Sequence, residues 1–92
     1  MSVKHTITRK LTQAFAPAEI EVVDDSERHR GHSGYREGGE THFNVRIVAE
    51  AFAGKSRVER HRMVHAALAE ELSGRVHALA LRVLTPQEWQ GE

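Results

Sequence analysis

The sequence of 92 residues has no cysteine and only two prolines, and its 13 basic side chains are balanced by 13 acidic ones. Without cysteine the chain has no disulfide, thiol nucleophile or thiolate metal site of its own. The balanced charge provides no general attraction to nucleic acid or membranes. No apolar run approaches the roughly 20 residues of a membrane span, and the amino terminus lacks a signal-peptide apolar stretch, so we expect a cytoplasmic protein.

Histidine is the one abundant residue type that stands out, with seven copies in the chain. The 39% of apolar and 28% of charged residues are typical of an ordinary globular protein. A chain of this length builds one small core, so we expect a single domain over residues 1–92.

The first half of the chain predicts one helix and two strands. A helix ending at Pro17 carries apolar residues at helical spacing, namely Val3, Ile7, Leu11, Ala14 and Phe15. Alternation predicts strands over 19–24, with Ile20 and Val22 on one face, and over 42–49, which places Phe43, Val45 and Ile47 together. Between them, a polar, glycine-rich stretch at about residues 25–41 predicts a flexible loop, and the two strands flanking it are expected to be antiparallel.

The second half predicts a helix, a strand and a short helix. Ser56 and Glu59 form a capping box that starts a helix running to about Leu72, before Gly74. Its predicted apolar stripe consists of Val58, Met63, Val64, Ala67, Leu68 and Leu72. Residues 76–84 predict a well-buried strand. Thr85, Pro86 and Glu88 repeat the capping pattern, and Trp89 is expected to fold back over the core.

This order of elements has a geometric consequence for the histidines. A strand–helix–strand crossover makes the second and third strands parallel, so both begin at the same end of the sheet. His42 and His77, at the two strand starts, are therefore expected to lie near one edge, where the loop with His29 and His32 also begins and ends.

Four segments closely resemble the BolA family: E-V-V-D-D-S-E-R-H, G-G-E-T-H-F-N-V-R-I-V, F-A-G-K-S-R-V-E-R-H-R-M-V and A-E-E-L-S-G-R-V-H-A-L-A-L. The match runs from about Ile7 to Trp89 in the family's order and spacing. The resemblance implies an α+β fold similar to class II KH domains, with a three-stranded mixed sheet packed on helices. It also implies a monothiol glutaredoxin as partner and a bridging [2Fe–2S] cluster, while some bacterial members are described as DNA-binding transcriptional regulators.

By this resemblance, His77 in R-V-H-A-L is one cluster ligand, and the second comes from the loop between the first two strands. Counting forward from D-D-S-E-R-H selects His29, whereas counting back from E-T-H-F falls closer to His32. His42 is a third option, for which a structural role is the better interpretation. A chain without cysteine offers only imidazoles to an iron–sulfur cluster, so a partner must supply the thiolates.

The remaining histidines favour simpler interpretations. His61 and His65 are four residues apart on the long helix, a spacing that allows two ligands on one face, but no third ligand is evident. Packed or partly buried helix histidines are the better interpretation. We expect His5 to be a solvated helix residue.

A basic region lies at the start of the long helix, where the only acidic side chain is Glu59; it comprises Lys55, Arg57, Arg60 and Arg62. Positive charge at a helix amino terminus opposes the helix dipole, which suggests an anion site for phosphate or an acidic partner. The alternative is a solvated face whose arginines pair with nearby acids.

Two hypotheses follow. The first is a non-enzymatic partner of a monothiol glutaredoxin that shares a histidine-ligated [2Fe–2S] cluster, for cluster trafficking or iron sensing, with no cofactor in the isolated chain. The second is a regulator that binds duplex DNA through residues 55–62, and the two functions are compatible. We expect no membrane partner, and a monomer or weak homodimer of the isolated chain. No catalytic triad, metal triad or paired-carboxylate motif indicates an enzyme.

Overall fold

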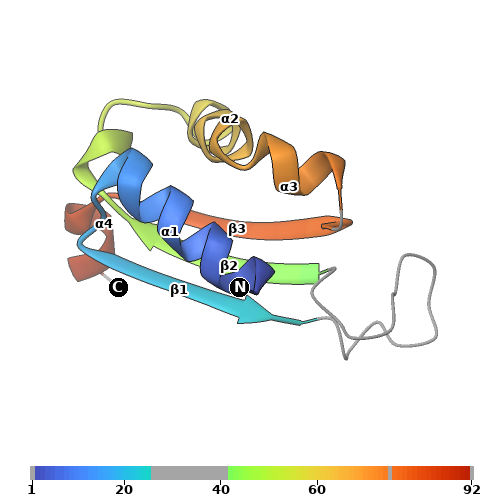
Figure 1. Ribbon diagram of the computed structural model, residues 1–92. Helices are drawn as coiled ribbons and strands as arrows, with labels where there is room; N and C mark the ends of the chain where they lie inside the picture. Colours follow the sequence, from blue (N-terminus) through green and yellow to red (C-terminus); the bar gives the residue numbers. More distant parts are fainter. Residues whose placement is uncertain (1, 26–41, 75, 92) are drawn as a thin grey trace.

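Helices cover one face of a three-stranded sheet in the computed structural model, which describes residues 2–25, 42–74 and 76–91 (Figure 1). The elements in chain order are α1 (Val3–Phe15), β1 (Glu19–Asp24), β2 (His42–Val48), the short 3-10 helix η2 (Glu50–Phe52), α2 (Arg57–Ala67), α3 (Ala69–Ser73), β3 (Ala78–Leu84) and α4 (Pro86–Gln90). This arrangement confirms the predicted α+β fold with a mixed sheet.

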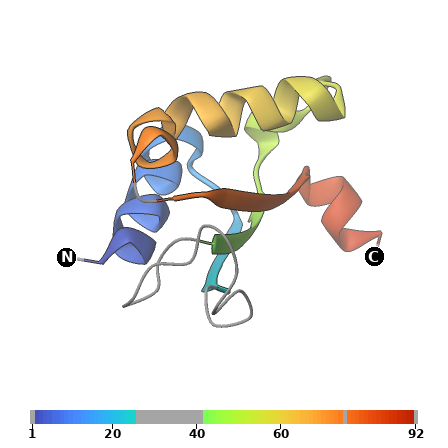
Figure 2. The same cartoon turned by 90° about the vertical axis from the view of Figure 1, so that its right-hand side faces the viewer.

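The sheet has β2 at its centre, antiparallel to β1 and parallel to β3. The register places Glu21 opposite Arg46 on one side of β2 and Ala78 opposite His42 on the other. Figure 2 shows α3 leading into one end of β3 and α4 following its other end. The predicted strand directions are therefore confirmed, and the parallel pair brings the starts of β2 and β3 together.

Side chains that alternate along the strands fill the space between the sheet and the helices. The buried apolar residues are Ile7, Leu11, Val22, Phe43, Val45, Ile47, Ala49, Phe52, Val64, Leu68, Val76 and Val83. The Phe15 and Phe52 rings meet with their centroids 4.9 Å apart, a spacing typical of favourable aromatic pairs. Burial of this apolar set is the main favourable term that holds the helices to the sheet.

Side-chain caps start the helices where the sequence predicts them. Ser56 and Glu59 form a reciprocal capping box at α2, and Thr85 and Glu88 form another at α4. These contacts satisfy backbone N–H groups that have no partner within the helix. No helix within the described segments is both long and apolar enough to cross a bilayer.

The predicted continuous helix from Ser56 to Leu72 is wrong, because it breaks at Leu68 into α2 and α3. Leu68 leaves helical geometry (φ −109°, ψ 21°), and its N–H is shared between the carbonyls of Val64 and His65. Leu68 itself stays buried in the core, where it is only 1% exposed. The break also directs α3 toward α1, which carries the partner of the acidic side chains of α3.

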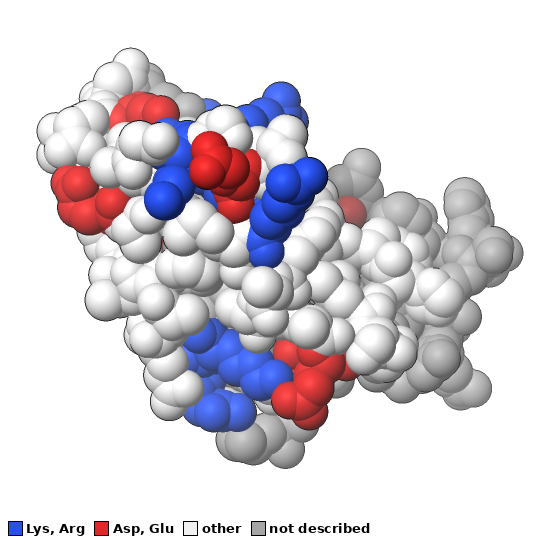
Figure 3. Space-filling view, turned by 90° about the horizontal axis from the view of Figure 1, so that it is seen from above, with Lys and Arg blue, Asp and Glu red and all other residues white. Residues whose placement is uncertain are grey.

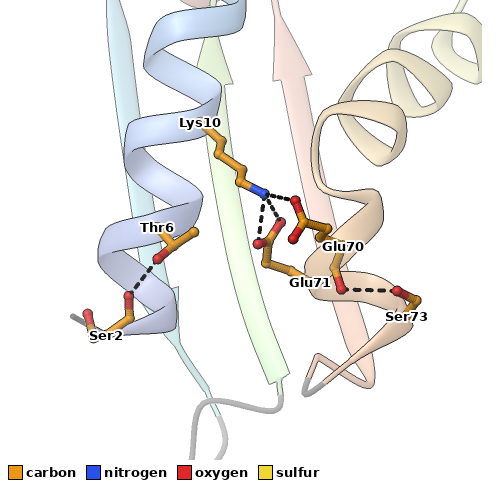
Figure 4. A network of polar contacts seen from close by, with 6 residues as sticks. All are labelled: Ser2, Thr6, Lys10, Glu70, Glu71 and Ser73. Carbon is orange, nitrogen blue, oxygen red and sulfur yellow. Dashed lines mark hydrogen bonds and ion pairs between the residues drawn. The ribbon is translucent and has the colours of Figure 1, made fainter.

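That partner is Lys10, which ties α1 to α3 (Figure 4). Its ammonium Nζ lies 2.9 Å from a Glu71 oxygen and 3.3 Å from a Glu70 oxygen. The hydrogen bond with Glu71, more than any other contact, raises the pKa of Lys10. Glu71 is the more sheltered carboxylate of the two, so it holds the firmer contact.

Two predictions of burial are wrong. Val58 was expected in the apolar stripe, but it is 58% exposed near the start of α2. The last strand was expected to be well buried from residue 76, but β3 begins at Ala78 and its exposed residues alternate with partly or fully buried ones. Helices cover only one face of the sheet, so every second side chain of β3 remains uncovered.

Trp89 does not fold over the core as predicted. Its ring instead covers the guanidinium of Arg46, with the Arg46 Cζ 4.6 Å from the ring centroid. Arg46 alternates with the buried Val45 and Ile47 along β2, so its side chain projects from the opposite face of the sheet. The terminal helix α4 therefore contributes a cation–π contact on the sheet face opposite the long helices.

Two valines of α2 allow a matched test of this packing. Val64→Ala removes methyl groups from a side chain that is fully buried, so we expect a loss of about 2 kcal/mol in the free energy of unfolding. Val58→Ala, the same change at the exposed position, should alter it by less than about 0.5 kcal/mol. Urea unfolding followed by circular dichroism measures both, and equal losses would contradict the observed orientation of α2.

Candidate functional site

Two histidines meet where β2 and β3 begin. His42 is the first residue of β2, and His77 directly precedes β3. Their rings are nearly parallel, at an interplanar angle of 16°, with centroids 6.3 Å apart. The proximity predicted from the parallel strands is therefore confirmed.

The two imidazoles differ in access to solvent. His42 is 7% exposed, and its carbonyl accepts a 2.8 Å hydrogen bond from the Asp25 N–H, which extends the pairing between β1 and β2. His77 is exposed. The pair thus consists of a buried ring and an accessible ring, and the ring of His77 is the one more open to an approaching group.

The other two histidines predicted for this edge, His29 and His32, lie outside the described residues. Among the residues that are described, no group of three or more histidine, aspartate or glutamate side chains is arranged to hold a metal ion. The described part of the site therefore offers imidazoles without a complete ligand set.

The remaining histidines are placed on helices. His5 is exposed on α1 and His65 is exposed on α2, whereas His61 is half-buried. Burial, followed by the positive charges of Arg57 and His65, lowers the pKa of the His61 imidazole. This environment disfavours a cation near His61, which is partly buried as predicted, whereas the prediction of a packed or partly buried residue is wrong for the exposed His65.

The basic region at the start of α2 divides into two parts. Lys55, Arg57 and Arg62 are exposed, whereas the Arg60 side chain is only 13% exposed. Glu59 lies among these cations in the sequence. The pKa of its carboxyl is lowered, chiefly by the hydrogen bond that it accepts from the Ser56 backbone N–H. Three cations therefore remain accessible at this helix end.

Arg60 joins three elements. Its guanidinium donates two hydrogen bonds to the Glu88 carboxylate, at 2.6 and 3.2 Å, and others to the carbonyls of Lys55 and Val83. The hydrogen bond from Arg60 is the largest cause that lowers the pKa of Glu88 to about 2, followed by that from the Thr85 backbone. Arg60 thus links α2, β3 and α4.

No local sequence pattern predicts the pairing of Arg60 with Glu88. The capping box identifies Glu88 as the acceptor for Thr85, but its second partner is 28 residues away along the chain. Arg60 fits the alternative interpretation of the basic region, in which the arginines pair with nearby acids. That interpretation does not describe the exposed Arg57 and Arg62, for which no ion pair is found within the described segments.

The distribution of charge on the helical side is mixed. Figure 3 shows basic side chains in separate groups with acidic side chains beside them. A hollow between the start of α2 and the edge of β3 nevertheless collects Lys55, Arg57, Arg60, Arg82 and the half-buried His61. This hollow therefore gathers four cationic side chains at the start of α2.

The chain matches the model of the BolA-like protein family over residues 11–88. It is 46% identical to the DNA-binding transcriptional regulator BolA of Escherichia coli (strain K12), over 99% of this chain and 83% of that protein. It is also 46% identical to human BolA-like protein 1, over 96% of this chain but only 61% of the human protein.

Solved structures show the same fold. The BolA domain of SufE1 from Arabidopsis thaliana superposes with a TM-score of 0.86 at 45% identity, covering 96% of each chain. The solution structure of mouse BolA1 gives a TM-score of 0.80 at 43% identity, covering 97% of this chain and 69% of the mouse chain.

The Arg60–Glu88 contact predicts a specific dependence of stability on pH. The pKa of Glu88 falls from 4.5 to about 2 in the folded state, so its stabilisation is present above pH 4.5 and is lost as the pH falls toward 2. Glu88→Gln keeps a cap acceptor but removes the charge. We expect a lower melting temperature than that of the wild type at pH 7, and a difference that shrinks below pH 4.5.

The control is Glu19→Gln, at an exposed position of β1. Melting curves between pH 2 and pH 7 should show no comparable dependence for this variant. A difference between wild type and Glu88→Gln that stays constant over the whole range would contradict the assignment of the stabilisation to the ionised carboxylate.

Proposed function

This chain belongs to the BolA-like protein family, and we propose that it is a non-enzymatic partner of a monothiol glutaredoxin with which it shares a [2Fe–2S] cluster. The observation that carries the proposal is the exposed His77 ring beside the buried His42 ring, at the start of two parallel strands. Such a protein serves in cluster trafficking or iron sensing.

The residues present fit one half of such a site. The chain has no cysteine, so its ligands to iron are neutral imidazoles, and thiolates come from the glutaredoxin cysteine and a glutathione. Histidine and cysteine ligands are combined in some iron–sulfur clusters, where histidine raises the reduction potential. The cluster supplies the redox chemistry when it is bound, and this chain positions an imidazole at an accessible sheet end.

The second imidazole comes from His29, His32 or His42. The burial of His42 and the pairing of its backbone with Asp25 support a role beneath His77 rather than as an iron ligand. His29 and His32 remain alternatives to each other, and substitution of each histidine identifies the ligand.

A second candidate function is regulation through duplex DNA. The E. coli relative is named a DNA-binding transcriptional regulator, and Lys55, Arg57 and Arg62 are exposed at the start of α2. Arg60 is engaged with Glu88, so we assign phosphate contacts to its three exposed neighbours. We propose no catalytic activity for the chain, because its sequence has no catalytic triad, metal triad or paired-carboxylate motif.

Cluster reconstitution tests the first function. Iron, sulfide, glutathione and a monothiol glutaredoxin are combined with or without this chain, and visible absorption and circular dichroism are recorded. We expect the wild-type chain to change the spectrum of the cluster and His77→Ala to abolish that change. His29→Ala, His32→Ala and His42→Ala then identify the second ligand by the same loss.

His65→Ala is the control, since this histidine is exposed on α2, away from the strand starts. It should give the wild-type spectrum. A spectrum that is the same with and without the wild-type chain would refute the shared cluster and leave DNA binding as the stronger proposal.

The salt dependence of binding tests the second function. Each phosphate contact contributes about −0.9 to the slope of log K against log salt concentration. Replacing Arg57 and Arg62 together by glutamine should therefore make the slope less steep by about 2, measured by fluorescence anisotropy with duplex DNA. Arg9→Gln on α1 is the control, and an unchanged slope in the double variant would exclude these contacts.

A further inference from the structure

β3 is an edge strand of the sheet. Among the described residues it pairs with β2 on one side, and no strand lies on its other side. Successive backbone groups of a strand point to alternate sides. The carbonyl of Leu84 accepts a hydrogen bond on the β2 side, whereas that of Val83 points outward, to an arginine of α2. By the same alternation, the backbone N–H and C=O groups of Leu79 and Leu81 point outward too.

The two edges of the sheet differ in charge. β1, the other edge strand, has the sequence E-I-E-V-V-D and thus carries three carboxylates. Charged side chains on an edge strand discourage its pairing with another chain. β3 has the sequence A-L-A-L-R-V-L, in which a single side chain is charged. β3 is therefore the edge that an additional strand would extend.

A hollow opens beside the outer edge of β3. The strand lines it with the consecutive residues 81–84, and α2 lines it with Arg57, Arg60 and His61. Because Arg60 also reaches the outward carbonyl of Val83, the hollow lies on the outer side of the strand. Its volume of about 520 Å³ is in the range of ligand sites. The hollow thus leaves room for a segment along β3.

The accessible charge of this hollow is positive. Lys55 and Arg57 line it, both are exposed, and neither has an ion pair within the described part of the chain. The acid of the hollow is Glu88, and its carboxylate is bound by Arg60 at 2.6 Å. Complementary charge therefore favours a segment that brings carboxylates to Lys55 and Arg57.

We propose that the outer edge of β3 accepts an extended, acidic segment of another protein as a fourth strand of the sheet. Main-chain hydrogen bonds with Leu79 and Leu81 provide affinity, and carboxylates beside Lys55 and Arg57 provide specificity. Arg60 occupies the carbonyl of Val83, so the added strand ends there. This interaction goes beyond the shared cluster and does not depend on it.

Other occupants of the edge are less favourable. A second copy paired through its own β3 would bring the same cations together. The β1 strand of a second copy is acidic, but pairing of β3 with β1 does not close and would produce open-ended assemblies. DNA would meet Lys55 and Arg57 through phosphates and would leave the main chain of β3 unpaired.

Binding of a synthetic peptide tests the proposal. The probe alternates glutamate with valine and threonine and has blocked ends. We expect binding by isothermal titration calorimetry, and hydrogen exchange of the Leu79 and Leu81 amides that is slower by about tenfold or more when the peptide is bound. The amides of Ala80 and Arg82 face β2, so their exchange should be unchanged.

Two N-methylated versions of the peptide separate main-chain pairing from charge attraction. Methyl groups on alternate residues remove the N–H groups from one side of an extended segment. The version methylated on the side that faces β3 should bind about tenfold or more weakly, and the version methylated on the other side should bind as the parent does. Equal affinities of the two versions would overturn the added strand, because charge attraction does not depend on which side is methylated.

A pair of charge reversals tests the role of the cations. Arg57→Glu should weaken binding of the parent peptide by about fivefold or more. Glutamate suits the first turn of a helix, so this variant should fold. Arg9→Glu makes the same change at an exposed position of α1 and should bind as the wild type does. Circular dichroism and melting temperatures establish that both variants are folded, and equal losses of affinity would overturn the assignment of carboxylates to this hollow.

The remaining outcomes separate this inference from the proposed function. No iron, sulfide or glutaredoxin is present, so His77→Ala should bind the peptide as the wild type does, whether or not a cluster is shared. Absence of peptide binding, or binding without protection of the Leu79 and Leu81 amides, would overturn the inference and leave the shared cluster standing. Self-association that protects these amides would assign the edge to a second copy, and binding of duplex DNA but not of the peptide would assign the hollow to nucleic acid.

Discussion

Coverage of only one sheet face by the helices is the constraint on which the other features of this molecule depend. Along each strand, one set of side chains packs under the helices and the next set faces away from them. Phe43, Val45 and Ile47 therefore enter the core, while Asn44 and Arg46 project from the other side. In the part of the chain that the structure describes, the long helices all lie on the first face of the sheet (Figure 1).

Mixed strand pairing then determines where the chemically distinctive residues gather. The parallel pairing of β2 with β3 places His42 and His77 at one end, and the residues that lead into α2 lie at the other. With a rise of about 3.3 Å per residue, a seven-residue strand separates these ends by roughly 20 Å. The histidine pair and the basic region are thus distinct sites on one scaffold.

Much of this arrangement could be predicted because the signals are local. Alternation located β1 and β2, and two capping boxes located the starts of α2 and α4. Parallel topology, a property of the element order, brought His42 and His77 together. Exposure was harder to predict: the exposure of Val58 depends on how α2 sits across the sheet.

Contacts between distant segments escaped prediction altogether. The contacts of Lys10 with Glu70 and Glu71, which accompany the break at Leu68, have no local signature in the sequence. Arg60 links the elements through Glu88 of α4, which is distant in the sequence. β3 brings Glu88 back beside α2 in the fold. The basic region in the sequence therefore overstates the charge available to a ligand, because Arg60 forms an ion pair with Glu88 in the folded chain.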